Sequence, residues 1–404
     1  MDGKLSRIAV DRALNSGAGV LRLRPSFVPR RFSLPGRRLK LHPDDYYALG
    51  TARGGIKERW LSSVIPAMNG PLAPADEGMS YVEPAEAGDA AFTLCDAISE
   101  FPEPLIGAEC RRRHGTFPIY SKFFDYQHPL FHHLHLDDEA AARVGRVGKP
   151  ECYYFPPQLN NHPGSMPVTY FGFSPEVTRE QVRERLALYR SGDNRITELS
   201  RAFRIELGTG WYTPPGVVHA PGSCLTYEPQ WNSDVNSVYE NVASGEVYPY
   251  DFLVENCPPG KAEDLDYVIG LMHWEKNIDP EYRRHYYRPP IIAEQTDAGV
   301  AKWITYGNPH MGAKEITVAP GQTWTLSEPL AFGCILVQGH GSLGVFAAET
   351  PTLLRYGQSS ADEYFVGHQA AANGVRLTNA SLVEPLVLLM HFGPGHPGQP
   401  SAAG

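Results

Sequence analysis

The sequence predicts a mainly β protein, on two observations. Between residues 313 and 394, short runs rich in β-branched and aromatic residues alternate with glycine turns, as in GCILVQGHGSLGVF and EPLVLLMHF. Farther upstream, residues 150–155 (PECYYF) and 211–213 (WYT) are also aromatic and favour strands. The segment GHGSLG is interpreted as a hairpin turn rather than a phosphate-binding loop, because no helix pattern follows it.

Two histidines in the run FHHLHLDDE, residues 131–139, give the first sign of chemistry. Side chains alternate along a strand, so a strand would place His133 and His135 on one face and His132 on the other. The acidic residues 137–139 follow at the start of an expected helix, where they favour the helix N-terminus. This run therefore predicts a pair of metal ligands followed by a helix cap.

A second stretch, GTGWYTPPGVVHAPG, adds a third histidine. Its Pro214-Pro215-Gly216 turn is rigid with a flexible exit, which lets the chain fold back and direct His219 inward. Between the two stretches, GKPECYY carries Glu151, while the neighbouring Cys152 should face the other side of its strand. The predicted metal ligands are His133, His135, Glu151 and His219.

Imidazole and carboxylate ligands suit zinc, iron, manganese, cobalt or nickel, and they do not choose among these metals. An HxH pair alone is common by chance in a chain with 15 histidines, and a single PxGxxH motif carries as little weight. Finding both in this order, with G-K-x-E between them, favours a metal site. The chain is then an enzyme or a metal-dependent binding protein rather than a scaffold.

The arrangement resembles a cupin, a small jelly-roll-like β-barrel whose two motifs send ligands to the barrel interior. The segments FPIYSKFFDYQHPLFHHLHLDDEAA, GKPECYY, GTGWYTPPGVVHAPG and TYEPQWNSD are similar to segments of the type I mannose-6-phosphate isomerases. Upstream, RGGIKERWLSSVIPAMNGPLA looks like a further segment of that family. The resemblance covers roughly residues 45 to 240.

This resemblance implies two cupin barrels, the first with a helical insertion. The second barrel lacks both metal motifs, so we expect it to be metal-free, with His340 and His368 as poor ligand candidates. Separate helices are expected at residues 90–100 and 261–271. The expected organisation is an arm at 1–44, a metal-binding domain at 45–241 with its insertion at 174–203, a connector at 242–312, and the second barrel at 313–404.

The resemblance also implies an aldose–ketose isomerase of carbohydrate metabolism, since family members interconvert mannose 6-phosphate and fructose 6-phosphate with a bound divalent metal, usually zinc. His133 stands where the family usually has Gln, which makes the site richer in nitrogen without removing a ligand. Lys122 matches a family lysine that could contact substrate or shuttle a proton; the alternative is an exposed strand-edge lysine. Glu228 matches a position that could supply a base or hold substrate; the alternative is an ordinary surface carboxylate.

One departure from the family concerns phosphate. The family has an arginine a few residues after its S-D motif, where this chain has Ser237 or Val238, and no Arg or Lys occurs between Glu206 and Gly260. A guanidinium is well suited to phosphate, so the expected substrate is either a sugar phosphate or an unphosphorylated sugar. The basic run at residues 111–113 could supply replacement charge, but such runs are usually solvated surface.

Composition fits a soluble cytoplasmic enzyme, and a homodimer remains open. The net charge of -9 argues against a nucleic-acid binder, and the N-terminus lacks the apolar core of a signal peptide. No apolar run approaches the roughly 20 residues that span a membrane. The 6 cysteines form no CxxC motif and indicate reduced thiols. Two other function classes remain: a cupin dioxygenase or lyase that uses iron, and a sugar-binding protein without activity.

Overall fold

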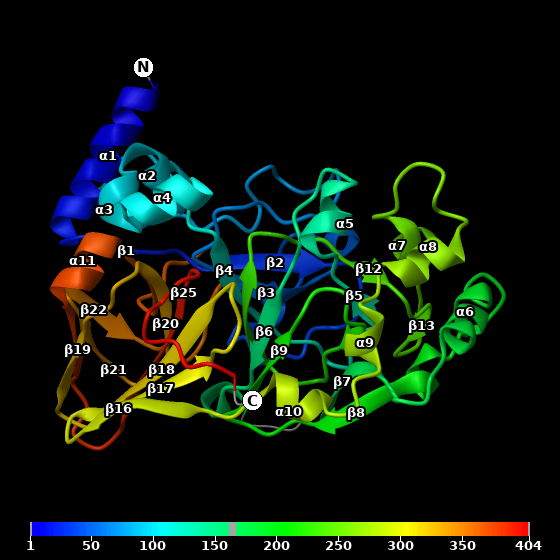
Figure 1. The fold of residues 1–404 in the computed structure, drawn as a ribbon. Coiled ribbons are helices and arrows are strands. Elements are labelled where there is room, and N and C mark those ends of the chain that lie inside the picture. The colour runs from blue at the N-terminus through cyan, green and yellow to red at the C-terminus, as the bar shows by residue number, and fades with distance from the viewer. Residues whose placement is uncertain (1, 161–166, 403–404) are drawn as a thin grey trace.

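The computed structural model describes residues 2–160 and 167–402 and confirms the mainly β prediction. Two groups of antiparallel strands lie side by side, and helices gather at the two ends of the molecule (Figure 1). Among the described residues, no helix combines the length and the apolar character that crossing a bilayer requires.

The first group contains a seven-stranded sheet in the order β15-β9-β6-β11-β4-β3-β2 and a five-stranded sheet in the order β12-β5-β10-β7-β8. Strands distant in sequence become neighbours in this order, so that β4 pairs with β11 and β5 pairs with β10. The bounds are β2 Ser26–Arg30, β3 Gly55–Leu61, β4 Ile119–Phe124, β5 His133–Leu134, β6 Glu151–Tyr154, β7 Val168–Phe173, β8 Ser200–Arg204, β9 Gly210–Thr213, β10 His219–Ala220, β11 Thr226–Trp231, β12 Ser237–Val238 and β15 Tyr287–Arg288.

The second group contains a seven-stranded sheet in the order β1-β23-β20-β25-β18-β17-β16 and a four-stranded sheet in the order β19-β24-β21-β22. The short strands β13 (Val242–Ala243) and β14 (Glu246–Val247) pair separately. The bounds are β1 Val20–Arg22, β16 Ile291–Thr296, β17 Gly299–Thr305, β18 Gly312–Val318, β19 Thr323–Leu326, β20 Phe332–Gln338, β21 His340–Leu343, β22 Phe346–Glu349, β23 Glu363–Val366, β24 Val375–Asn379 and β25 Leu386–Phe392.

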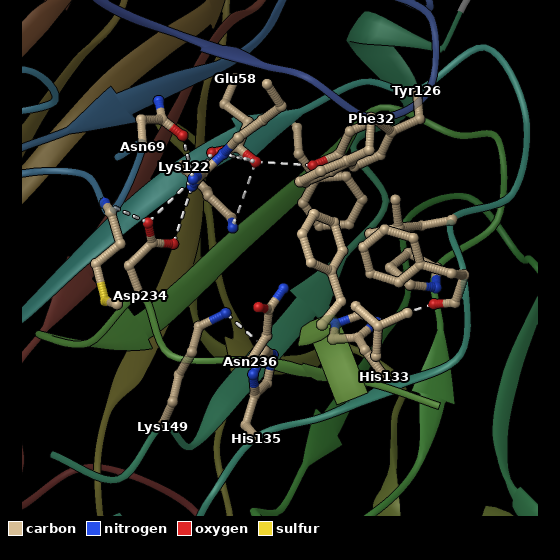
Figure 2. Close-up of a pocket in the computed structure, with 18 of the residues that line it drawn as sticks. Phe32, Glu58, Asn69, Lys122, Tyr126, His133, His135, Lys149, Asp234 and Asn236 are labelled. Atoms are coloured by element: carbon tan, nitrogen blue, oxygen red, sulfur yellow. Dashed lines mark hydrogen bonds and ion pairs between the residues drawn. The ribbon is translucent and has the colours of Figure 1, made fainter. Parts of the chain in front are cut away.

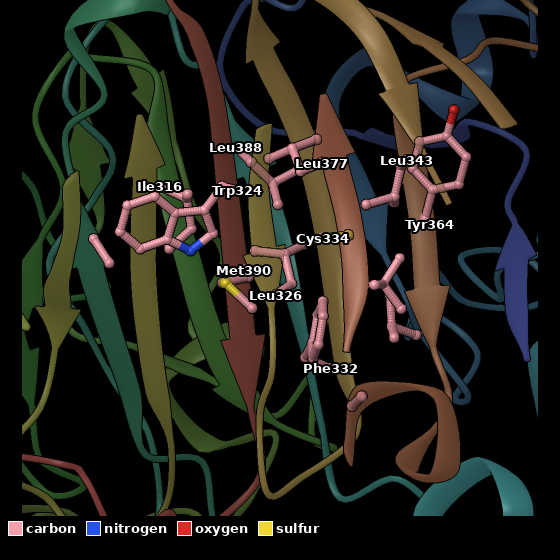
Figure 3. Packing of buried hydrophobic residues seen from close by; sticks show 14 of the residues in the cluster. Ile316, Trp324, Leu326, Phe332, Cys334, Leu343, Tyr364, Leu377, Leu388 and Met390 are labelled. Atoms are coloured by element: carbon pink, nitrogen blue, oxygen red, sulfur yellow. The ribbon is translucent and has the colours of Figure 1, made fainter. Parts of the chain in front are cut away.

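The second group of strands encloses an apolar core. Trp324 from one sheet and Phe332, Leu388 and Met390 from the other are buried together, as Figure 3 shows. This packing follows from the alternation of apolar residues along the short strands predicted in this region. The predicted GHGSLG hairpin is confirmed, because β21 and β22 pair directly and Gly344 turns the chain with a φ of 55°.

The helices are short. Their bounds are α1 Asp2–Ser16, α2 Leu94–Glu100, α3 Pro102–Ile106, α4 Ala108–His114, α5 Asp138–Ala142, α6 Arg179–Ala187, α7 Asp251–Val254, α8 Leu265–Gly270, α9 Trp274–Asn277, α10 Tyr282–Tyr286 and α11 His368–Asn373. Single turns of 3-10 helix occur at Pro43–Asp45, Thr51–Arg53, Pro157–Leu159 and Ile196–Leu199.

Three predicted helices begin later than expected. The helix expected from residue 90 starts only at Leu94, because Thr93 and Asp96 form a capping box at that point. In the helical insertion expected at 174–203, Thr178 caps α6, so the helix begins a few residues after the first residue of that range. The helix expected over 261–271 is present as the shorter α8.

The N-terminal segment contributes a strand to each group. β1 pairs with β23 of the second group, and β2 pairs with β3 of the first. Buried polar contacts also join the groups: Arg59 forms two 2.8 Å hydrogen bonds to Asp362, and the Tyr154 hydroxyl donates to Glu315 at 2.7 Å. The N-terminal strands and these buried polar contacts together hold the two groups of strands against each other.

Candidate metal centre

Three histidines predicted as ligands come together at the join of two short strands. His133 on β5 lies directly opposite His219 on β10, and His135 follows β5. The predicted turn delivers His219, since Gly216 has a φ of 77° and its N–H donates to the His135 carbonyl at 2.8 Å. Ligand atoms of the three imidazoles all lie within 4.8 Å of one another, and all three side chains are buried.

The imidazoles are oriented by the backbone. Nδ1 of His133 lies 3.0 Å from the Phe131 carbonyl, and Nδ1 of His219 lies 2.9 Å from the Val217 carbonyl. Nδ1 of His135 lies 2.7 Å from the Val235 carbonyl, just before β12. A carbonyl can only accept, so each Nδ1 carries the proton and each Nε2 presents a lone pair. Histidines that bind metals are held in this way.

Glu151 on β6 faces two of these lone pairs. Its Oε2 lies 2.9 Å from His135 Nε2 and its Oε1 lies 3.0 Å from His219 Nε2. Glu151 Oε1 and His219 Nε2 have no hydrogen-bond partner in the described structure, whereas Oε2 also lies 2.9 Å from the Lys149 ammonium. Acceptors that face one another without a proton need a cation between them, so the side chains fit a bound metal ion.

The protonation states agree with this description. Burial and the neighbouring imidazoles hold the pKa of His133 well below its ordinary value, and burial lowers the pKa of His135 to about 3. Burial opposes ionisation of Glu151, but Lys149 and His135 hold its pKa well below the usual carboxyl range. Neutral imidazoles beside an ionised carboxylate are the forms in which these groups bind a metal.

Lys149 lies next to the four predicted ligands, although the sequence analysis assigned it no role. Its Nζ is 2.9 Å from Glu151 Oε2, 3.0 Å from His135 Nε2 and 3.7 Å from Glu228 Oε1. The G-K-x-E motif could have predicted this position. Lys149 lies two residues before the ligand Glu151, so on an extended chain both side chains share one face.

The centre lies in a cavity of about 240 Å³ that carries several further charges. Lys122 on β4 and Glu228 on β11 are opposite each other in register, and Lys122 Nζ lies 3.2 Å from Glu228 Oε1. Figure 2 shows Lys122 and Glu58 along one side of the pocket and His133, His135 and Lys149 along another. Both Lys122 and Glu228 are buried, so neither is the surface residue that the sequence left as an alternative.

Opposing effects set the charge states of this pair. Burial and the charge of Glu151 raise the pKa of Glu228 to about 8, although Lys122 and Lys149 oppose the rise. Burial disfavours the Lys122 ammonium, but Glu228 and Glu58 raise its pKa above the ordinary lysine value. Lys122 therefore stays protonated and positively charged, while Glu228 titrates near pH 8.

Arg30 and Glu58 form a second charged cluster in the pocket wall. The Arg30 guanidinium lies 3.0 Å from Glu58 Oε2 and 2.9 Å from Asp234 Oδ1. Glu58 also accepts from Trp60 Nε1 at 2.8 Å and from the Tyr126 hydroxyl at 2.7 Å. The sequence analysis missed Arg30 because it lies in the segment predicted as an arm, outside the recognised motifs.

The remaining predicted positions lie away from the centre. His132 faces the other side of its strand, with Nδ1 2.7 Å from Glu240. Cys152 points away from the ligands toward Asn308, as expected. Asp137 caps α5 by accepting from an amide at 2.8 Å. The basic run at residues 111–113 is exposed on α4 and pairs with carboxylates of the surface, which confirms the solvated interpretation.

Comparisons with known proteins agree with the sequence motifs. No protein-family model matches the chain. Over 170 residues the chain is 30% identical to the Bacillus subtilis (strain 168) protein named "Putative mannose-6-phosphate isomerase YvyI". That match covers 41% of this chain and 46% of the relative, so the chain matches about half the length of that protein.

Solved structures extend the likeness of fold to nearly the whole chain. The mannose 6-phosphate isomerase of Bacillus subtilis matches with a TM-score of 0.58 and 16% identity, covering 92% of this chain and 99% of that one. A point mutant of phosphomannose isomerase from Salmonella typhimurium matches with a TM-score of 0.61 and 12% identity, covering 93% and 100%. Together with the shared motifs, these matches confirm the resemblance to the mannose-6-phosphate isomerases that the sequence shows.

Proposed function

We propose that the protein is a metal-dependent aldose–ketose isomerase resembling mannose-6-phosphate isomerase. One observation supports this above the others. Three Nε2 lone pairs and the Glu151 carboxylate converge in a pocket that also holds a lysine–carboxylate pair, Lys122 and Glu228. Isomerisation of an aldose requires both kinds of group, because sugar oxygens must be polarised while a proton moves between adjacent carbons.

A divalent cation, with zinc as our first choice, would be held by His133, His135, Glu151 and His219. The nitrogen-rich ligand set also suits iron, manganese, cobalt or nickel. When bound, the cation supplies Lewis-acid polarisation of the substrate oxygens. The chain's own contribution to this step is orientation, because backbone carbonyls fix the histidine rings before any ligand arrives.

Glu228 is proposed to carry the proton between the first two carbons of the sugar through an enediol. Its pKa of about 8 lies near working pH, where a carboxyl group can both accept and donate a proton. Lys122 is proposed to bind a sugar oxygen as an ammonium donor and to hold Glu228 in place. Its raised pKa makes the alternative of a proton shuttle at Lys122 unattractive.

The test is exchange of the sugar's carbon-2 proton with deuterium from D2O, followed by NMR. The purified protein would be stripped of metal, reloaded with zinc, iron, manganese, cobalt or nickel in turn, and given a panel of free and phosphorylated aldoses. We expect exchange and ketose formation only with a metal-loaded protein. If no metal supports exchange with any sugar of the panel, the proposal is wrong.

A cupin dioxygenase or lyase that uses iron is the main alternative, because the same ligand set could hold that metal. A sugar-binding protein without activity is the other. Oxygen consumption with an iron-loaded protein would favour the first, and sugar binding without proton exchange would favour the second. The lysine–carboxylate pair beside the ligands favours proton transfer over both.

The architecture fits the same proposal. We infer that each group of strands is a cupin barrel, the first carrying the metal at residues 45–241 and the second, at residues 313–404, without metal. The proposed arm, insertion and connector are residues 1–44, 174–203 and 242–312. Among the described residues, the three-histidine cluster belongs to the first group of strands.

A further inference from the structure

We propose that the pocket selects an unphosphorylated aldose and rejects the corresponding sugar phosphate. The inference rests on the proposed isomerase function and names its substrate class. It is drawn from how the positive charges inside the pocket are paired, and from a neutral amide that lies among them.

Three buried cations of the pocket, Lys122, Lys149 and Arg30, are each shared between two carboxylates. Lys122 Nζ lies 3.2 Å from Glu228 and 3.9 Å from Glu58. Lys149 Nζ lies 2.9 Å from Glu151 and 3.7 Å from Glu228. A phosphate that bound either ammonium would have to compete with the buried carboxylates that the ammonium already contacts.

Arg30 follows the same pattern, since its guanidinium bonds to both Glu58 and Asp234. All three cations and their four carboxylates have side chains no more than 7% exposed. With all four carboxylates ionised, one negative charge is in excess, and a divalent metal would leave a single positive charge. That charge does not neutralise the two negative charges of a phosphate ester, whereas an unphosphorylated sugar brings no charge into the pocket.

The amide of Asn236 lies at the centre of the pocket. In Figure 2 it lies between Lys149 and His133, and it makes no side-chain hydrogen bond within the described parts of the chain. An amide offers both donors and an acceptor, which suits sugar hydroxyls, and it brings no charge for a phosphate. The adjoining residues of β12, Ser237 and Val238, are buried and uncharged.

Two further arginines, Arg31 and Arg53, line the pocket. Arg53 is paired with Glu77 and also donates to the Leu72 carbonyl at 2.9 Å. Arg31 is exposed and forms no ion pair with any residue that the structure describes. An exposed guanidinium is screened by water and contributes little affinity, so we assign Arg31 no part in selecting the substrate.

The experiment compares mannose with mannose 6-phosphate on the zinc-loaded protein, by carbon-2 exchange and by calorimetric titration. We expect kcat/KM for mannose to exceed that for mannose 6-phosphate by about 100-fold, because the ester must compete with buried carboxylates for each ammonium. The result that would overturn the inference is an equal or higher kcat/KM for the phosphate ester. If neither sugar exchanges, titration decides the inference: binding of mannose alone supports it, while binding of the ester, or of neither, overturns it. The isomerase proposal itself fails only if the whole panel of metals and sugars shows no exchange.

Two variants locate the selectivity. Asn236→Arg should raise kcat/KM for mannose 6-phosphate relative to mannose by at least about 10-fold, because it adds an unpaired guanidinium. Gln295→Arg, on the exposed strand β16, adds the same charge far from the pocket and should change nothing. Arg31→Gln should also leave the ratio unchanged. A wild-type activity on mannose 6-phosphate that disappears in Arg31→Gln would instead identify Arg31 as a phosphate-binding residue and contradict the inference.

Discussion

Lys122 and Glu228 are cross-strand partners whose side chains meet inside the pocket. They lie opposite each other in the antiparallel register of β4 and β11, with Lys122 Nζ 3.2 Å from Glu228 Oε1. Both are buried, and their pKa values are raised, that of Glu228 to about 8. The pair joins the metal ligands to the second charged cluster, since Lys122 also lies 3.9 Å from Glu58.

Replacing Glu228 by Gln should abolish proton transfer and leave metal binding intact. The amide keeps the shape of the side chain but cannot accept the carbon-bound proton, so kcat should fall by roughly 100- to 10,000-fold. Deuterium exchange measures the loss, and metal analysis of the same sample provides the control. A variant that retains wild-type exchange would remove Glu228 from the proposed mechanism.

Activity should rise with pH because a base must be ionised to accept a proton. Without metal, burial and Glu151 raise the pKa of Glu228 to about 8. A bound cation would offset the charge of Glu151, so the rise in kcat/KM should be centred below that pH. The measurement is a profile from about pH 5 to about pH 10. A profile flat over this range would argue against Glu228 as the titrating group.

Histidines 132 and 133 offer a matched pair for testing the metal site. His133→Ala should lower the bound metal well below about one ion per chain, because it removes a ligand. His132→Ala should retain the metal, since this ring faces Glu240 on the other side of the strand. Metal analysis after dialysis distinguishes them. Equal loss of metal in both variants would mean that the effect comes from misfolding rather than from lost coordination.

Removing the metal should destabilise the fold by mass action. Adding zinc at 100 times its dissociation constant should raise the free energy of unfolding by about 2.7 kcal/mol relative to protein with chelator. Magnesium prefers oxygen ligands and should have a smaller effect on the melting temperature at the same concentration. Identical melting temperatures with chelator and with zinc would count against a metal bound by the folded chain.

The buried pair of Arg30 and Glu58 should contribute to stability. Glu58→Ala leaves the guanidinium with Asp234 alone, and breaking such a pair costs about 3–5 kcal/mol in the free energy of unfolding. Burial opposes ionisation of Glu58, but Arg30 and Lys122 lower its pKa below the ordinary value. Its contribution is therefore present above about pH 4.3 and is lost as the pH falls further.

Chemical denaturation of wild type and variant at neutral pH measures this loss. Ser191→Ala, on the exposed surface, is a suitable control and should cost less than about 0.5 kcal/mol. A loss for Glu58→Ala no larger than that of the control would show that the buried pair adds nothing to stability.

Local pattern was sufficient for part of the site. A spacing of two residues on a strand brought His133 and His135 to one face, and the Pro-Pro-Gly turn predicted the inward approach of His219. The alternation of side chains along a strand also predicted correctly that Cys152 faces away from the metal ligands. These features depend on neighbours within a few residues, so the sequence alone contains them.

Helix ends were predicted less well. The later start of α2 depends on one capping box, in which the Thr93 side chain accepts from the Asp96 amide while the Asp96 carboxylate accepts from the Thr93 amide. The sequence signals that indicated this helix do not fix its first residue. A cap made by a few hydrogen bonds decides that position.

The sequence by itself predicted the mainly β fold, the three clustered histidines and the resemblance to the mannose-6-phosphate isomerases. Only the tertiary structure revealed Arg30, Lys149 and Asn236 in the pocket and showed that Arg30, Lys122 and Lys149 are each shared by two carboxylates. The physical reason is distance. Charge pairing and pKa depend on separations of a few ångströms between side chains from different strands, and the order of residues along a chain does not specify those separations.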